Sequence, residues 1–251
     1  MIILKSEDEI EKLRRANQIV AMALSKITDM VEIGITTEEL DRVAEKMITA
    51  EGAKPSFKGY RGFPNALCAS INEEVVHGIP SKRKLKKGDV VKLDLGTNYE
   101  GYFGDSAVSV PVGGVSEDVM HLLKATREAL YKGIEQMKEG NRLSDISHAI
   151  QQHAEMNGFS VVTDFVGHGI GRSPHEDPQV PNYGPPGQGP KLKAGMVLAI
   201  EPMVNVGTHE VKVLSDDWTV VTLDGKLSAH FEHSVAVTKN GPDILSELVR
   251  N

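Results

Sequence analysis

The stretch Asp89–Val110, DVVKLDLGTNYEGYFGDSAVSV, decides the fold class of this chain. Its segments 90–95 and 102–110 are rich in β-branched and apolar residues, and the turn-like tetrapeptide NYEG separates them, so the pattern predicts a β-hairpin. If this four-residue loop closes symmetrically, Asp94 lies directly opposite Asp105. Two carboxylates in that position repel each other unless a cation neutralises them. The hairpin therefore suggests a divalent-metal site; the alternative is a solvated hairpin whose aspartates never meet.

Length and composition limit the class of protein. The chain has 251 residues, of which 40% are hydrophobic, enough for one large domain or two small ones with a real core. The net charge of −7 argues against a nucleic-acid binder that uses its whole surface. The single cysteine, Cys68, excludes an intrachain disulfide, and neither a signal peptide nor an apolar run of about 20 residues is recognisable. We expect a cytoplasmic protein with no membrane and no specific nucleic-acid partner.

Helical and strand patterns alternate along the chain. The predicted helices are 6–29, 36–52, 116–137 and 144–158. The predicted strands outside the hairpin are 66–71, 159–164, 196–200, 218–222 and 233–237. Glycines 34 and 52 recur as glycines 140 and 158, which indicates a weak internal duplication with halves of about 6–110 and 116–240. The sequence thus predicts a single α+β domain over 1–251, with helices on one face of a curved sheet and a site on the other.

Three further stretches carry residues suited to metal chemistry. FVGHGIG places His168 between glycines, which allows close approach of backbone and ligand. The apolar strand MVLAIEP ends in Glu201, and AHFEHSV places Glu232 among aromatic and apolar neighbours, where a free carboxylate is costly. A lone histidine is more often a packed or surface residue. The apolar surroundings of Glu201 favour a functional role, and those of Glu232 are likewise unusual for a free charge. With Asp94 and Asp105 they form a hard donor set suited to two ions such as Mn, Fe or Co, rather than to a cysteine-rich zinc site.

In their order along the chain, these motifs resemble those of the methionine aminopeptidases, in the M24 family of pita-bread metallopeptidases. The resemblance covers about residues 6–241 and rests on LDLG with GYFGDSA, GHGIGRSPHEDP, AIEPM and AHFEHSVAVT. It implies the pita-bread fold, in which two pseudo-symmetric α/β halves share a curved antiparallel sheet. It also implies two divalent metal ions (Co, Mn, Fe or Zn, which the sequence does not distinguish), with Asp105 and Glu232 bridging them. The implied ligands are Asp94, Asp105, His168, Glu201 and Glu232.

The same resemblance implies removal of the initiator methionine from nascent proteins and peptides. A hydroxide activated by the metal pair would attack the peptide carbonyl, with Glu201 moving the water proton and the substrate amino terminus near Asp94. His77, in NEEVVHGIP, and His175 match the family histidines that contact the substrate amide and carbonyl. The implied substrate-binding residues are Tyr60, Phe63, Cys68, His77, His175 and Trp218. Without the resemblance, these aromatic residues and the cysteine would be assigned to the core and both histidines to surface loops.

Several features bear on subtype, rivals and partners. Glu201 and Glu232 are too close in sequence for the helical insertion of type II enzymes, which indicates the short type I form. Pro174 and Phe57 depart from the family and leave the exact pocket shape open. A proline-specific aminopeptidase or dipeptidase, or a creatine-type amidinohydrolase, generally has a large additional amino-terminal domain. A non-catalytic binding protein of this fold would lack several ligands. We expect a monomer that acts on nascent polypeptides with N-terminal methionine, with transient ribosome contact.

Overall fold

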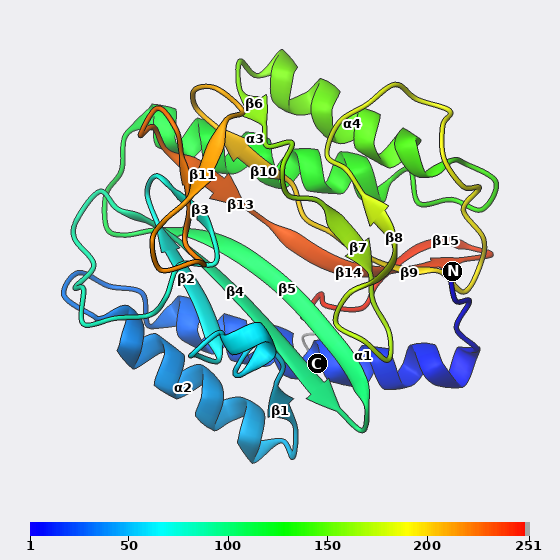
Figure 1. Ribbon diagram of the computed structural model, residues 1–251, viewed down its shortest axis with the longest axis horizontal. Coiled ribbons are helices and arrows are strands. Elements are labelled where there is room, and N and C mark those ends of the chain that lie inside the picture. The colour runs from blue at the N-terminus through cyan, green and yellow to red at the C-terminus, as the bar shows by residue number, and fades with distance from the viewer. Residues whose placement is uncertain (249–251) are drawn as a thin grey trace.

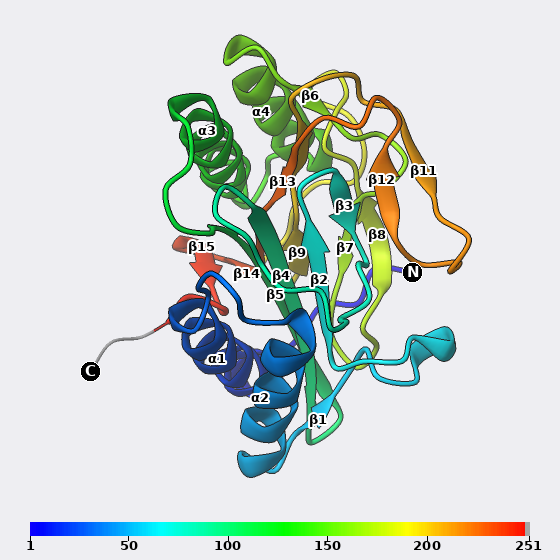
Figure 2. The ribbon, with the colours of Figure 1, turned by 90° about the vertical axis from the view of Figure 1, so that its left-hand side faces the viewer.

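Four α-helices lie on one side of a curved antiparallel sheet in the computed structural model, which describes residues 1–248 (Figures 1 and 2). The helices are α1 (Glu7–Asp29), α2 (Thr37–Ala50), α3 (Glu117–Ile134) and α4 (Leu143–Met156), which confirms the four predicted helices. The predicted capping boxes start α1 and α2. Ser6 and Thr36 each accept a hydrogen bond from a backbone N–H three residues on, and Glu9 and Glu39 accept one in return.

The main sheet has nine strands in the order β1-β4-β5-β14-β9-β7-β8, with β2 also on β4 and β15 also on β14. Their bounds are β1 (Lys54–Pro55), β2 (Leu67–Ile71), β4 (Val90–Tyr99), β5 (Tyr102–Pro111), β7 (Gly167–Gly169), β8 (Glu176–Val180), β9 (Val197–Ile200), β14 (Glu232–Thr238) and β15 (Gly241–Ile244). Two three-stranded sheets flank it. The first consists of β13 (Ser228–His230), β10 (Met203–Asn205) and β6 (Ser160–Val161). The second consists of β11 (Val211–Val213), β12 (Val220–Thr222) and β3 (Glu74–Val76).

Strands β4 and β5 form the predicted hairpin, but the predicted register was wrong. Asp94 pairs with Ala107, and Asp105 pairs with Gly96, so the two aspartates are diagonal neighbours rather than directly opposite. The cause is the turn, because pairing continues to the last residue of β4 and only Glu100-Gly101 remains as the loop. Both loop residues have left-handed backbones, with φ of 51° and 80°, as a tight two-residue hairpin turn requires. The partner changes by two residues, so both carboxylates still lie on one face.

Each pair of helices buries its own hydrophobic cluster against the sheet. Helices α1 and α2 enclose one cluster with β2 and β4, which includes Ile19, Leu40 and Leu93. Helices α3 and α4 enclose a second with β9 and β14, which includes Ile146 and Leu198. Full burial of such a side chain contributes about 1.5–3 kcal/mol. The helix-covered face of the sheet is therefore the hydrophobic core, and polar groups on β4, β5 and β14 point to the other face.

Helix α1 lies directly on the hairpin. Thr97 donates a hydrogen bond to the carbonyl of Ala16 at 3.0 Å, and the backbone N–H of Asp105 donates to the side-chain oxygen of Asn17 at 3.2 Å. A Cβ at Gly104 would lie only 2.7 Å from the backbone of Ala16 and Asn17. Glycine at this position therefore sets the distance between the helix and the strand that carries Asp105. Within residues 1–248, no helix is long and apolar enough to cross a membrane.

Replacement of Gly104 by alanine should test this packing. We expect Gly104→Ala to lower the free energy of unfolding by on the order of 1–3 kcal/mol, because the added methyl group collides with backbone rather than with a movable side chain. Urea denaturation measures the change. Gly114→Ala is the matched control, since its Cβ would meet only the flexible side chain of Lys87, at 3.7 Å. Equal stability of both variants would contradict the close approach.

Candidate metal centre and substrate cavity

The predicted metal ligands lie on the face of the sheet opposite the helices. Strand pairing arranges four of the five in two adjacent rows. The first row is Cys68, Asp94, Ala107 and Glu232 on β2, β4, β5 and β14. The second row is Gly96, Asp105, Ser234, Ala199 and His168, in which the hydroxyl of Ser234 donates to the carbonyl of Asp105 at 2.8 Å. Alanine, glycine or serine separates the ligands, which leaves space between their side chains.

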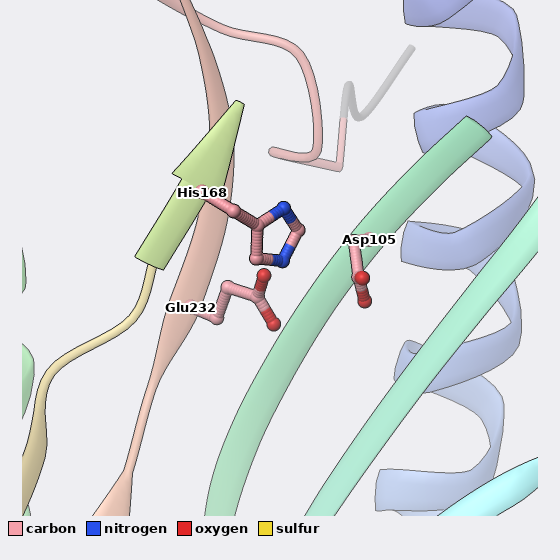
Figure 3. Close-up of side chains that lie close together, drawn as sticks. All are labelled: Asp105, His168 and Glu232. Atoms are coloured by element: carbon pink, nitrogen blue, oxygen red, sulfur yellow. The ribbon is translucent and has the colours of Figure 1, made fainter. Parts of the chain in front are cut away.

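Asp105, His168 and Glu232 form the closest group. One ligand atom of each lies within 4.8 Å of the others, and the three side chains converge from β5, β7 and β14 (Figure 3). All three residues are buried, with exposed fractions of 5%, 8% and 2%. A single ion between them is within reach of two carboxylates and one imidazole, and that donor set suits a divalent transition metal.

Glu201 extends this group just after the end of β9. Its Oε1 lies 3.5 Å from Nε2 of His168. Nδ1 of His168 lies 3.0 Å from the carbonyl oxygen of Gly169 and donates its proton there, so Nε2 presents a lone pair. A lone pair and a carboxylate oxygen that face each other repel, and a cation between them would turn this repulsion into attraction.

Glycines on both sides of His168 fit the prediction of a close backbone approach. A Cβ at Gly167 would lie 2.4 Å from the carbonyl oxygen of Ala199, and one at Gly169 would lie 2.3 Å from that of Asp177. Strand β7 thus packs closely between β9 and β8, with no room for side chains at these two positions. The two glycines fix the position from which the imidazole reaches the carboxylates.

Burial raises the pKa of all four carboxyl groups, and repulsion raises it further for three of them. Burial raises the pKa of Asp94 to about 7. Burial and then the charges of neighbouring carboxylates raise the pKa values of Asp105, Glu201 and Glu232 well above their usual range. Burial lowers the pKa of His168 to about 4, which keeps its imidazole neutral at pH 7. The cluster therefore holds protons on its own and would release them to a cation.

Three buried oxygens in the cluster have no hydrogen-bond partner among the described residues. They are Oδ1 of Asp94, Oδ1 of Asp105 and Oε1 of Glu232. Each unsatisfied buried polar atom lowers the free energy of unfolding by about 1–3 kcal/mol, so three such atoms in one cluster indicate that a ligand binds there. Together with the free lone pair of His168, these atoms form a hard donor set that fits divalent ions.

One cavity of about 440 Å³ brings together all the residues predicted for the site. It is lined by Tyr60, Phe63, Cys68, His77, Asp94, Asp105, His168, His175, Glu201, Trp218 and Glu232. Phe57, one of the two departures from the family pattern, also lines it, whereas Pro174 does not. Carboxylates thus form one part of the wall and aromatic rings another, and Arg61 and Asp164 add opposite charges.

His77 lies within the aromatic part of the cavity. Its ring makes edge-to-face contacts with Phe165 and Trp218, with centroid distances of 5.7 and 6.1 Å, and Trp218 contacts Phe63 at 5.1 Å. The backbone of His77 has a left-handed φ of 60°, a strained conformation of the kind found at functional sites. Burial lowers the pKa of His77 to about 4, so the ring is neutral and carries one N–H donor.

His175 lies between Tyr60 and the metal cluster. Its ring stacks on Tyr60 with a centroid distance of 5.5 Å and lies 4.3 Å from the ring of His168. Burial and the charge of Arg61 lower the pKa of His175. The neighbouring Glu176 anchors the loop, because its carboxylate accepts hydrogen bonds from two backbone N–H groups and pairs with Lys5 at 2.6 Å.

Sequence reasoning missed one buried histidine next to this cluster. His230 is 1% exposed, and neither of its ring nitrogens has a hydrogen-bond partner among the described residues. Its Nε2 lies 3.9 Å from Oε2 of Glu201. Burial, together with the charges of His77 and Lys92, lowers its pKa to about 3. Strand alternation was the available signal, because His230 stands two residues before Glu232 and so shares its face.

A larger groove of about 1100 Å³ lies between α1 and α3 on the helix side of the sheet. It contains none of the predicted site residues. His233 lines it, next to Glu232 in sequence but on the opposite face, and bonds to Ser246 at 2.8 Å. The chemistry-bearing groups are thus confined to the smaller cavity.

The curved sheet with its helices on one side, and the buried carboxylates and imidazole on the other, are the features of a metallopeptidase of the pita-bread class. The chain belongs to metallopeptidase family M24, whose sequence model matches residues 11–239. It is 57% identical to a methionine aminopeptidase from Clostridium perfringens over 98% of this chain and 99% of that protein. The crystal structure of a methionine aminopeptidase from Thermotoga maritima has a TM-score of 0.97 at 48% identity, over 98% of this chain and 100% of that one.

More distant relatives share the fold within longer chains. A prolidase from Pyrococcus horikoshii matches with a TM-score of 0.81 at 25% identity, and the match covers all of this chain but 65% of the prolidase. This difference in length agrees with the expectation that proline-specific relatives contain an additional domain.

The Lys5–Glu176 ion pair should contribute strongly to stability. Both side chains are buried, 5% and 10% exposed, so Lys5→Met leaves a buried carboxylate without its charge partner. We expect a loss of about 3–5 kcal/mol in the free energy of unfolding, measured by chemical denaturation. Lys58→Met is the matched control, because Lys58 and Glu45 are also 2.6 Å apart but are exposed, and removal should have little effect. Similar losses in both variants would rule out burial as the cause.

Proposed function

We propose that this protein is a metal-dependent aminopeptidase that removes N-terminal methionine from proteins and peptides. The observation that carries the proposal is the joint lining of one cavity by a carboxylate–imidazole cluster and by aromatic and sulfur-containing side chains. The 57% sequence identity to a methionine aminopeptidase, over 98% of this chain, supports N-terminal methionine as the substrate residue.

The proposed cofactor is a pair of divalent ions, drawn from Co, Mn, Fe and Zn. Asp94, Asp105, His168, Glu201 and Glu232 would hold them. Two ions in such a site supply Lewis acidity, which polarises the scissile carbonyl and makes a water molecule nucleophilic. The unpartnered carboxylate oxygens and the free Nε2 of His168 support this ligand set.

Three residues are proposed to carry the proton and hydrogen-bond chemistry. Glu201 accepts the proton of the attacking water and passes it to the leaving amine, a role supported by its place in the cavity wall beside His168. His77 and His175 each donate one N–H to the substrate, at the amide and at the carbonyl oxygen on which negative charge develops. Their lowered pKa values support neutral rings, which donate hydrogen bonds without giving up a charge.

The proposed methionine pocket is the aromatic part of the cavity. Tyr60, Phe63, Cys68, His77, His175 and Trp218 surround the space beside the metal ligands. Burial and the nearby aspartates raise the pKa of Cys68 well above its usual value, so the group is a neutral thiol that suits a thioether side chain. Phe57 further narrows the pocket.

The cellular setting is also part of the proposal. A cytoplasmic monomer with transient ribosome contact would meet nascent chains as their amino termini emerge. The two helix pairs share one sheet, which supports a single catalytic domain rather than two separable ones.

Peptide hydrolysis tests the activity directly. Protein stripped by chelator and resupplied with Mn²⁺ or Co²⁺ should release methionine from Met-Ala-Ser and nothing from Ala-Pro-Ser. Asp105→Asn should lower kcat/KM at least about 1000-fold, because loss of a shared ligand removes several kcal/mol of transition-state stabilisation. Asp118→Asn, at an exposed aspartate in the first turn of α3, should retain full activity. Cleavage of Ala-Pro-Ser instead would assign the proline-specific branch, and no turnover of either would favour a binding protein.

Metal binding should stabilise the protein more as pH rises from 5.5 to 8. Without metal, the raised carboxyl pKa values mean that the folded state binds more protons than the unfolded state, so stability falls as pH rises through about 7, the pKa of Asp94. Bound ions replace those protons, so the increase in Tm on adding Mn²⁺ should grow over this range. Calorimetry in two buffers of different ionisation enthalpy should show proton release. A metal-induced Tm increase that is constant or falls with pH would contradict the account.

A further inference from the structure

The inference concerns His230, a buried imidazole that the proposed mechanism does not use. It is the last residue of β13, and the next strand, β14, begins at the predicted ligand Glu232. Its backbone is held firmly, because the hydroxyl of Ser109 donates to its carbonyl at 2.7 Å and accepts from its N–H at 2.9 Å. The main chain is thus fixed, whereas the side chain has no hydrogen bond to any described residue.

A fully buried imidazole without partners is costly. A neutral ring has one N–H donor and one acceptor nitrogen, and leaving either unsatisfied costs stability that a leucine of similar size would not lose. His230 is 1% exposed and lines no part of the cavity surface, so substrate does not reach it. Its partner must therefore come from a group that already lies beside it.

Glu201 is that group. Its two carboxylate oxygens face two different imidazoles, with Oε1 at 3.5 Å from Nε2 of His168 and Oε2 at 3.9 Å from Nε2 of His230. The two rings differ in their proton positions. His168 donates its ring N–H to the carbonyl of Gly169. The ring of His230 has no other acceptor within residues 1–248, so its N–H is available to Glu201. One oxygen thus faces a lone pair and the other faces a donor.

We propose that His230 is a positioning residue that donates a hydrogen bond from Nε2 to Oε2 of Glu201 and so directs Oε1 toward the metal site. This inference rests on the proposed metal centre. A hydrogen bond to the carboxylate oxygen that faces away from the metal fixes the rotation of a ligating carboxylate. Loss of such a hydrogen bond typically costs about 10–100-fold in metal affinity or activity. The two atoms are 3.9 Å apart in this structure, so the proposed hydrogen bond requires them to move closer.

Calorimetric titration with Mn²⁺ tests the proposal on the full chain. His230→Leu should weaken metal binding about 10–100-fold. His230→Gln, which keeps an N–H donor of similar reach, should stay within about threefold of the unaltered protein. The matched control is His233→Leu, which removes a partly buried imidazole from the opposite face of the sheet and should leave metal affinity unchanged. Unaltered affinity in His230→Leu would overturn the proposal, and so would an equal loss in His233→Leu.

A second measurement does not depend on the folding of the leucine variant. In protein with ¹⁵N-labelled histidine, the Nε2–H resonance of His230, assigned by its absence in His230→Gln, should move downfield and exchange more slowly when Zn²⁺ is added. No change in a protein that demonstrably binds Zn²⁺ would overturn the role of His230. Failure of the unaltered protein to bind Mn²⁺ or Zn²⁺ at all would instead overturn the proposed metal centre, so the two failures are distinguishable.

Discussion

Four carboxyl groups buried close together on one face of the sheet are the constraint to which the rest of the structure responds. Asp94, Asp105, Glu201 and Glu232 are brought together by strands from both halves of the chain, and burial raises the pKa of each. Such a cluster opposes folding unless protons or cations neutralise it. The hydrophobic clusters under the two helix pairs supply the stability that holds it together. Hydrophobic burial thereby offsets the cost of a carboxylate cluster that favours the binding of cations.

Small residues make this arrangement geometrically possible. Alanine and glycine separate the ligands across the sheet, and Gly167 and Gly169 let β7 pass between two neighbouring strands. Gly104 brings α1 onto the strand that carries Asp105. Four of the five candidate ligands therefore lie on packed strands, and Glu201 directly follows β9, which fixes their spacing. The two cavity-lining histidines differ, since His77 follows β3 and His175 precedes β8, so both are placed by short loops.

The sequence predicted helices and hairpin well because local signals specify them. Capping boxes and helical periodicity gave the helices, and the aspartates of the hairpin were correctly placed on one face. The register failed because strand propensity does not reveal how far pairing runs into a turn. Eight short strands were not predicted: β1, β3, β7, β8, β10, β11, β13 and β15. Among them, β7, β8 and β10 contain glycine or proline or follow a proline, and β7 and β10 form through partners distant in sequence. His230 was missed because its significance lies in a contact with Glu201 that only the tertiary structure reveals.

The central claim is that this carboxylate–imidazole cluster is a two-ion centre. The most direct test is an anomalous difference map from crystals grown with Mn²⁺ or Co²⁺, recorded on both sides of the metal absorption edge. The account predicts two peaks in the cavity, both contacting Asp105 and Glu232, one near Asp94 and the other near His168 and Glu201. No peak in the cavity, or peaks bound only by surface residues, would contradict it.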